Sequence, residues 1–271
     1  MKQPFLYQGS KVSHLDILIP MIPDHECFIE VFGGSGSLLL NKDPSDYEIY
    51  NDFDEYVWNF FKVLRDKPRE LIKKLELTPY SRKEYKYNVN SKADKRLSAV
   101  EKARRWYMVQ AISFSGRYGA GIRSVNFKDS FVNFPKRFSD RCRYLEVFAR
   151  RLSDVMIENL SFEKLIEKYD KEASFFYLDP PYLGATKNDS TVYDEELTEE
   201  QHELLVDCLV NLKGKGLLSC YDHEIYDRLL DNGWKKSSYH KMTTMDRNDI
   251  RDREETIYFN YKLDGLQRSL L

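Results

Sequence analysis

The 271-residue sequence predicts an α/β protein built on a mostly parallel, doubly wound sheet. Residues 174–178 form a short apolar run, typical of a buried parallel strand, that stops at Asp179 and the two prolines after it. Residues 27–32 form a second apolar run, and a glycine turn at 33–36 follows it directly. Along the rest of the chain, predicted strands alternate with predicted helices, which is the order that gives a parallel sheet.

The individual elements follow from hydrophobic spacing, turn residues and capping residues. The expected strands are 27–32, 47–50, 155–159, 174–178, 216–221 and 256–261. One helix is expected to start at 37–40. The other expected helices are 53–66, 69–77, 97–113, 140–156, 161–169, 198–212 and 225–230. Ser161 is the expected N-cap of one helix, and Thr198 with Gln201 forms a capping box at the start of another.

Composition indicates a soluble globular protein, with 42% hydrophobic and 32% charged residues. No stretch approaches the roughly 20 apolar residues that span a membrane, and the first residues show no apolar signal core, so nothing suggests export. The cysteines, at 27, 142, 208 and 220, are scattered without a C-x-x-C pair, and the five histidines are scattered too. We therefore expect reduced thiols in a cytosolic protein, and neither a disulfide framework nor a metal site.

The charge is distributed unevenly although the net charge is only −2. Residues 117–151 carry nine lysines or arginines against three acids, whereas residues 189–207 carry eight acids and no lysine or arginine. Within the basic stretch, residues 113–138 interleave glycines, aromatic rings and basic side chains in what is expected to be a loop or β-hairpin. Such a mixture suits stacking on bases and contact with phosphates. The candidate contacts are Arg117, Tyr118, Arg123, Lys128, Lys136 and Arg137.

The first strand and its glycine turn indicate a nucleotide site. The order strand, glycine turn and following helix brings backbone close to a ligand. Asp52 lies 19 residues after Gly33, behind a second strand, where an acid binds a ribose diol in nucleotide-binding units. No Gly-Lys-Ser/Thr closes the turn and no G-x-G-x-x-G is present, so neither a P-loop nor a dinucleotide enzyme is indicated. Residues 27–52 are thus interpreted as a site for an adenosine-bearing ligand.

Four motifs occur in an order that resembles the Dam-like (D12 class) adenine-N6 DNA methyltransferases. They are Tyr7-x-Gly9-x-Lys11, the stretch from Glu30 through Phe32 to the glycine turn, Asp52, and Asp179-Pro180-Pro181-Tyr182. The resemblance runs nearly end to end and includes the closing Arg253-Glu254-Glu255-Thr256. It departs from the usual family motifs at Tyr7, which replaces a tryptophan, and at Val31, which replaces a proline.

This resemblance implies a Rossmann-like S-adenosylmethionine-dependent methyltransferase sheet with an inserted, mostly helical target-recognition domain. The catalytic domain would comprise residues 1–56 and 155–271, and the DNA target-recognition domain residues 57–154. The implied cofactor-binding residues are Tyr7, Lys11, Glu30, Phe32, Gly33, Gly34, Gly36, Asp52 and Asp179, and the implied catalytic residues are Asp179, Pro180, Pro181 and Tyr182. The expected partners are double-stranded DNA and a cognate restriction endonuclease. A monomer in the bacterial or phage-type cytoplasm, associated with the nucleoid, is expected.

The chemistry of the Asp179 motif fits methylation of an exocyclic amine. The lone pair of adenine N6 is delocalised into the ring, so the amine is a poor nucleophile. The Asp179 carboxylate and the Pro180 carbonyl can each accept one N6–H, localising the lone pair for in-line attack on a sulfonium methyl. Tyr182 would stack on the base, which must be flipped out of the duplex. No metal is needed, and because no Pro-Cys dipeptide occurs, the cysteine route of C5-cytosine methylation is unsupported.

Three alternatives remain open at the level of sequence. The same chemistry on cytosine N4 is one, although Asp179 favours adenine over it, and adenine in RNA is another. A catalytically silent DNA-binding regulator with this fold is the third, and the intact motifs at Lys11, Asp52 and 179–182 argue against it. A dinucleotide-dependent oxidoreductase is disfavoured by the missing glycine fingerprint.

Overall fold

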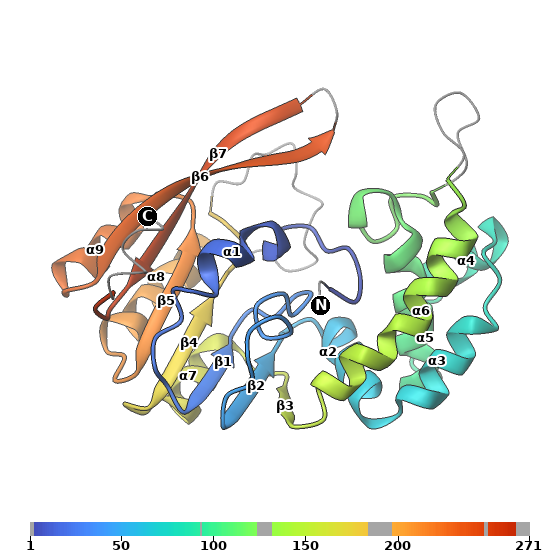
Figure 1. The fold of residues 1–271 in the computed structure, drawn as a ribbon, viewed down its shortest axis with the longest axis horizontal. Coiled ribbons are helices and arrows are strands. Elements are labelled where there is room, and N and C mark those ends of the chain that lie inside the picture. The colour runs from blue at the N-terminus through green and yellow to red at the C-terminus, as the bar shows by residue number, and fades with distance from the viewer. Residues whose placement is uncertain (1–2, 93, 124–131, 184–196, 247–248, 264–271) are drawn as a thin grey trace.

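The centre of the computed structural model is one mixed sheet with the strand order β3-β2-β1-β4-β5-β7-β6 (Figure 1). The structure describes residues 3–92, 94–123, 132–183, 197–246 and 249–263. The strands are β1 Cys27–Glu30, β2 Tyr47–Asn51, β3 Val155–Glu158, β4 Ser174–Leu178, β5 Lys215–Cys220, β6 Lys235–Asp246 and β7 Asp249–Phe259. Strands β1 to β5 pair in parallel, and β7 is antiparallel to both of its neighbours. The predicted mostly parallel, doubly wound sheet is confirmed.

The order of the strands reverses between β1 and β4. Strand β1 pairs with β2 on one side and with β4 on the other, and Glu30 lies level with Tyr50 and with Tyr177. The segments that leave these three strands therefore begin at the same height along one edge of the sheet. In open α/β sheets this reversal point is where ligands bind.

Helices cover both faces of the sheet. They are α1 Leu15–Leu18, α2 Glu55–Asp66, α3 Pro68–Glu76, α4 Arg82–Asn90, α5 Ala99–Ile112, α6 Phe134–Arg151, α7 Phe162–Tyr169, α8 Glu199–Val210 and α9 Asp227–Asp231. Alternate residues of β4 belong to different apolar clusters: Phe175 packs in the cluster of α2, α5 and α6, and Phe176 in the cluster of α7, α8 and α9. Both faces are buried, which is why β4 is an uninterrupted apolar run.

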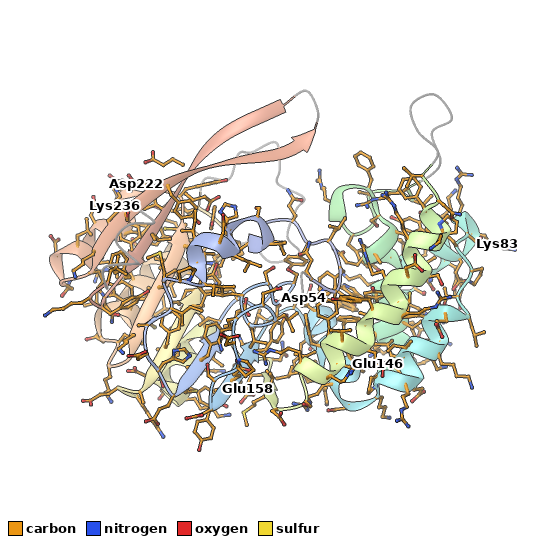
Figure 2. All side chains as sticks on the ribbon, in the orientation of Figure 1. Asp54, Lys83, Glu146, Glu158, Asp222 and Lys236 are labelled. Atoms are coloured by element: carbon orange, nitrogen blue, oxygen red, sulfur yellow. The ribbon has the colours of Figure 1, made fainter. Side chains whose placement is uncertain are left out.

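Helices α2 to α6 all come from the segment between β2 and β3. Figure 1 shows α3, α4, α5 and α6 together on the right, beyond the edge strand β3. In Figure 2, Asp54 lies where this group meets the sheet, and Lys83 and Glu146 lie on the helical side. Helix α2 starts at this junction, because the Asp54 side chain accepts hydrogen bonds from the backbone of Tyr56 and Val57. The α2 residue Phe61 then packs against Tyr50 of β2, with 4.3 Å between ring centres and 38° between the ring planes.

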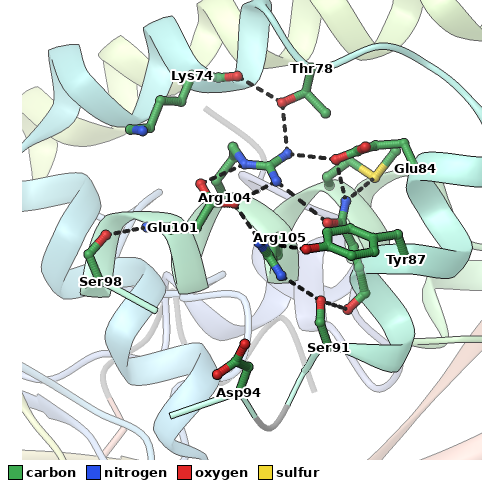
Figure 3. Close-up of polar contacts among 12 residues, drawn as sticks. Lys74, Thr78, Glu84, Tyr87, Ser91, Asp94, Ser98, Glu101, Arg104 and Arg105 are labelled. Carbon is green, nitrogen blue, oxygen red and sulfur yellow. Dashed lines mark hydrogen bonds and ion pairs between the residues drawn. The ribbon is translucent and has the colours of Figure 1, made fainter. Parts of the chain in front are cut away.

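A buried arginine cluster holds the helical group together (Figure 3). The Arg104 guanidinium of α5 donates to Thr78 at 3.0 Å, to Glu84 of α4 at 3.2 Å and to Glu101 at 2.7 Å. Arg105 bonds Glu101 as well, at 2.8 Å. The planar fork of arginine suits such multiple contacts, and their fixed geometry makes α4 and α5 one rigid unit.

A second charged cluster ties the helical group to the sheet. Glu48 of β2 bonds Lys42 at 2.6 Å and also pairs with Arg151, the last residue of α6. All three side chains are nearly or fully buried, so the charges stabilise the structure only as a paired set.

Several elements differ from the predicted ones. No helix starts at 37–40: residues 34–41 form turns, because the Glu30 carboxylate accepts the Leu39 N–H and Arg151 donates to the Leu39 carbonyl, taking the place of helix hydrogen bonds. Helix α6 begins at 134, six residues earlier than predicted, because Asn133 caps it, and it ends at 151 before β3. Helix α4 and strand β6 were not expected. Ser161 precedes α7 as predicted, but its hydroxyl bonds the Glu163 side chain at 2.6 Å and caps no backbone N–H.

Candidate active site

A cavity of about 330 Å³ lies where β1, β2 and β4 end. Its volume falls in the range of small-molecule sites, ~300–1,000 Å³. Eight of the nine residues predicted to bind a cofactor line it: Tyr7, Lys11, Glu30, Phe32, Gly33, Gly34, Asp52 and Asp179. The ninth, Gly36, packs against Leu40 and Phe61 and holds the turn in shape through its φ of +66°.

The turn after β1 is too tight for any residue but glycine at its first two positions. A Cβ on Gly33 would lie 2.3 Å from the Tyr50 ring and 2.7 Å from the Asn51 carbonyl. Gly34 has a φ of +50°, and a Cβ there would lie 2.9 Å from the Tyr7 ring. The Tyr50 hydroxyl donates to the Gly34 carbonyl at 2.8 Å. The turn is thus clamped between two tyrosines, with its backbone at the cavity wall.

Asp52, at the end of β2, braces this turn from the other side. One carboxylate oxygen accepts the Gly34 N–H at 2.6 Å, and the other accepts the Asp54 N–H at 2.9 Å. A carboxylate offers about four lone-pair sites, so these two bonds fix its orientation and still leave it able to accept from hydroxyl groups. The side chain lines the cavity.

Glu30 lies at the base of the cavity and is nearly fully buried. Burial raises the pKa of its carboxyl to about 8, and the negative charge of Asp179 adds to the increase, against the opposing effect of the backbone N–H groups of Leu38 and Leu39. At neutral pH this side chain is therefore mainly a neutral acid.

Asp179 follows β4 and is paired with Lys11 from the N-terminal segment. The Lys11 ammonium lies 2.9 Å from Asp179 Oδ1, although the approach is not in the direction of a hydrogen bond, and it lies 4.0 Å from Glu255 Oε2. Burial raises the pKa of Asp179, and the Lys11 charge opposes that increase. For Lys11, the charges of Asp179 and Glu255 outweigh burial, so its pKa is raised. Asp179 is thus ion-paired with Lys11 at the edge of an apolar cavity.

The other residues of the Asp179 motif differ in their positions. Pro181 lines the cavity beside Asp179, Pro180 is buried, and Tyr182 is half-buried. The Lys11 ammonium lies 4.6 Å from the centre of the Tyr182 ring. The Tyr182 hydroxyl donates to Glu255 Oε2 at 2.7 Å. All four residues lie together at the end of β4.

Several cavity residues were not among those predicted from the sequence. Among them are five apolar side chains that follow β2 and β3 or lie just before and within α8: Phe53, Leu160, Phe162, Leu197 and Leu204. Phe53 is 56% exposed, unusual for a phenylalanine, and Phe162 lies 5.9 Å from Phe32, ring centre to ring centre. The available sequence signal was a phenylalanine directly after the acid at the end of a strand. These rings make one wall of the cavity suitable for a flat heterocycle.

The predicted DNA contacts lie on or beside one tract of the helical group. Ser113 and Ile122 form an antiparallel bridge that closes the base of this tract, as in a hairpin. Arg117 and Tyr118 lie half-exposed between the two bridged residues. Arg123 lies just after the bridge, and Lys136 and Arg137 are exposed in the first turn of α6. Lys128 lies outside the described residues.

The N-terminal segment connects this tract to the cavity. The buried Gln110 side chain of α5 donates to the Leu6 carbonyl at 2.6 Å and to the Gly116 carbonyl at 2.7 Å. Tyr7, the next residue, lies against the glycine turn at Gly34. A single amide therefore joins the candidate DNA-binding tract to a wall of the cavity.

No three His, Cys, Asp or Glu side chains among the described residues are placed to hold a metal ion. None of the helices that these residues form has the length and apolar character to cross a membrane.

Comparisons with known proteins agree on one family. Residues 7–248 match the family model described as D12 class N6 adenine-specific DNA methyltransferase. The type II methyltransferase M1.LlaDCHI of Lactococcus lactis subsp. cremoris is 30% identical over 222 residues, which cover 75% of this chain and 73% of that protein. The DNA adenine methylase of Escherichia coli (strain K12) is 24% identical, with 74% and 73% covered. The modification methylase LlaI of Lactococcus lactis subsp. lactis is 24% identical over 96% of this chain, but only 43% of its own length.

Proposed function

The chain belongs to the D12 class of N6 adenine-specific DNA methyltransferases, and we propose from this premise that the cavity binds S-adenosylmethionine and that the residues 179–182 receive the target adenine. Its reaction is the transfer of a methyl group from S-adenosylmethionine to N6 of adenine in DNA. The observation that carries the assignment of the site is the meeting of Asp52, the glycine turn and Asp179 around one cavity at the sheet reversal.

The cavity residues fit each part of the cofactor. Asp52 accepts hydrogen bonds from ribose hydroxyls, and the backbone of the glycine turn faces the methionine portion. Phe32, Phe53 and Phe162 supply apolar surface for the adenine ring. Asp179 and Glu255 share the single charge of Lys11, so the group keeps a surplus negative charge that complements a sulfonium. When bound, the cofactor supplies an electrophilic methyl group.

Asp179 activates the target amine by accepting a hydrogen bond from it. The carboxylate accepts one N6–H and the Pro180 carbonyl accepts the other, which localises the nitrogen lone pair. Lys11 favours the ionised, accepting form of Asp179, and the several lone pairs of a carboxylate allow it to serve both groups. Tyr182 stacks on the base, which is flipped out of the duplex because N6 cannot otherwise reach the cavity.

Residues 57–154 act as the target-recognition domain in this proposal. The half-exposed Arg117, Tyr118 and Arg123 on the bridged tract, together with Lys136, Arg137 and Lys128, contact bases or phosphates. The rigid Arg104 cluster supports the tract, since Tyr85 of α4 bonds both Ser113 and the Gly121 backbone, at 2.9 and 3.0 Å. Rigid support is what a recognition surface requires to hold its register on a duplex.

The deciding experiment is methyl transfer from labelled S-adenosylmethionine to unmethylated genomic DNA, followed by digestion to nucleosides. The expected product is N6-methyladenine, and Asp179→Ala is expected to abolish it. Asp231→Asn, an exposed change on α9, serves as the matched control and keeps full activity. N4-methylcytosine as the product would overturn the substrate, and product on RNA alone would overturn the DNA assignment. Wild-type rates in Asp179→Ala would overturn the role of Asp179.

Partners and location follow from the same proposal. Because relatives named modification methylases match this chain, we expect it to work beside a cognate restriction endonuclease. We also expect a monomer in the cytoplasm of a bacterium or a phage-infected cell, where its DNA is found.

A further inference from the structure

We propose that Glu255 is a positioning residue of the methylation site: it fixes the ring of Tyr182 through the phenol and draws part of the Lys11 charge away from Asp179. The inference rests on the proposed function, because it assumes that Tyr182 and Asp179 receive the target base. Glu255 lies on β7, 73 residues after Tyr182 in the chain, and none of the roles assigned above includes contact between it and the base.

The position of Glu255 in the sheet explains how it reaches the site. Strand β7 runs antiparallel between β5 and β6, and Thr256 is level with Cys220, the last residue of β5. Glu255 is therefore next to the carboxyl end of β5, on the same edge as Asp179. Its side chain is 8% exposed, whereas the neighbouring Glu254 is exposed to solvent. A buried carboxylate is costly unless it is paired, and both of its partners belong to the site.

The first partner is the Tyr182 hydroxyl. It donates to Glu255 Oε2 at 2.7 Å and lies 3.1 Å from the Ser219 hydroxyl, from which it can accept. The ring also meets the edge of Tyr221, at 4.4 Å between centres and 67° between planes. Two hydrogen bonds at the tip and one aromatic contact at the side fix the ring plane. A stacking platform that is fixed before the base arrives does not have to be ordered at the moment of binding.

The second partner is Lys11. Its ammonium lies 2.9 Å from Asp179 and 4.0 Å from Glu255, so its charge is divided between the two carboxylates. Without the charge of Glu255, Lys11 would be held by Asp179 alone and would compete more strongly with the adenine amine for that carboxylate. Loss of Glu255 should therefore reduce the rate of methylation more than cofactor binding, because the cavity wall formed by Asp52 and the glycine turn is untouched.

The test is a double-mutant cycle of Glu255→Gln and Tyr182→Phe, with Glu254→Gln as the matched control on the opposite face of β7. The single-turnover rate on a duplex is measured together with the dissociation constant of S-adenosylmethionine. Each of the two single changes is expected to lower the rate about tenfold, with cofactor binding within about twofold of wild type. The double variant is expected to be little worse than Glu255→Gln alone, because glutamine removes the charge from the same hydrogen bond that phenylalanine deletes. Glu254→Gln is expected to match wild type.

A second readout reports the position of the base directly. A duplex with 2-aminopurine at the target position gains fluorescence when the base leaves the stack and loses part of it on stacking against a tyrosine. Both single variants are expected to show altered fluorescence in the bound complex, which a purely structural defect would not produce. Wild-type rates in Glu255→Gln, or a double variant whose loss is the product of the two singles, would overturn the inference. Failure of the wild-type enzyme to form N6-methyladenine would instead overturn the proposed function.

Discussion

Replacing the buried Glu30 by glutamine should remove a pH dependence from the stability of this protein. The folded-state pKa of Glu30 is raised to about 8 from an ordinary value of 4.5, mainly by burial. The unfolded chain releases this proton at lower pH than the folded protein does. Stability is therefore greatest at or below the unfolded pKa and falls as the pH rises from about 4.5 towards about 8.

The size of the effect follows from the difference between the two pKa values. Each pKa unit corresponds to about 1.4 kcal/mol, so the 3.5 units between 4.5 and about 8 amount to about 5 kcal/mol. That is comparable with the whole stability of many domains, ~5–15 kcal/mol. Glutamine keeps the shape and an oxygen that can accept the Leu39 N–H, but it does not ionise.

The assay is urea unfolding at several pH values between 5.5 and 7.5. The slope of unfolding free energy against pH is expected to be more negative in wild type than in Glu30→Gln by about 1.4 kcal/mol per pH unit. Glu70→Gln, at an exposed position of α3, is the control and is expected to follow wild type. Parallel profiles for wild type and Glu30→Gln would refute the reasoning, because they would mean that Glu30 is already ionised in the folded protein.

Three further predictions follow from the site and its supports. Gly33→Ala places a Cβ 2.3 Å from the Tyr50 ring, so titration calorimetry should show loss of S-adenosylmethionine binding. An affinity within about threefold of wild type would contradict the claim that the turn admits only glycine at this position. Arg151→Met removes one of the two cations paired with Glu48, so urea unfolding should show a loss of about 3 kcal/mol in the free energy of unfolding. A loss below about 1 kcal/mol would mean that the cluster adds little. The logarithm of DNA affinity should fall linearly with the logarithm of salt concentration. Arg137→Gln should reduce the magnitude of that slope by about one unit, whereas Lys73→Gln, on α3, should not. Equal slopes for wild type and Arg137→Gln would exclude Arg137 from the phosphate contacts.

The parts of the site that the sequence predicted are those that depend on strand ends. Asp179 follows an apolar run and Asp52 follows a strand-like segment, and parallel strands bring such residues to one edge of the sheet whatever the rest of the chain does. A backbone clamped between two rings tolerates no side chain, so this turn requires glycines, and the glycines are visible in the sequence. Local sequence was sufficient for these features because each depends on one strand and the turn that follows it.

The missed parts depend on distant segments. Phe162 has the sequence signal of a core residue, and only the packing of the loop after β3 beside β1 exposes it to the cavity. Glu255 is one of two adjacent glutamates, and which of them faces Tyr182 depends on the pairing of β7 with β5 and β6. The turns at 34–41 replaced a predicted helix because Arg151, more than 100 residues away, bonds the Leu39 carbonyl.

Three of the acids that line the cavity differ in their environments within a short distance. Glu30 is kept mainly neutral by burial, Asp52 is oriented by two backbone N–H groups, and Asp179 is held against Lys11. Differences of environment of this kind are how enzymes assign separate roles to chemically identical side chains. A second ionised acid at Glu30 would raise the pKa of Asp179 further and favour its protonated form, which cannot accept from an amine through both oxygens. In the proposed mechanism, the neutral form of Glu30 therefore favours an accepting Asp179, because no second negative charge beside it opposes its ionisation.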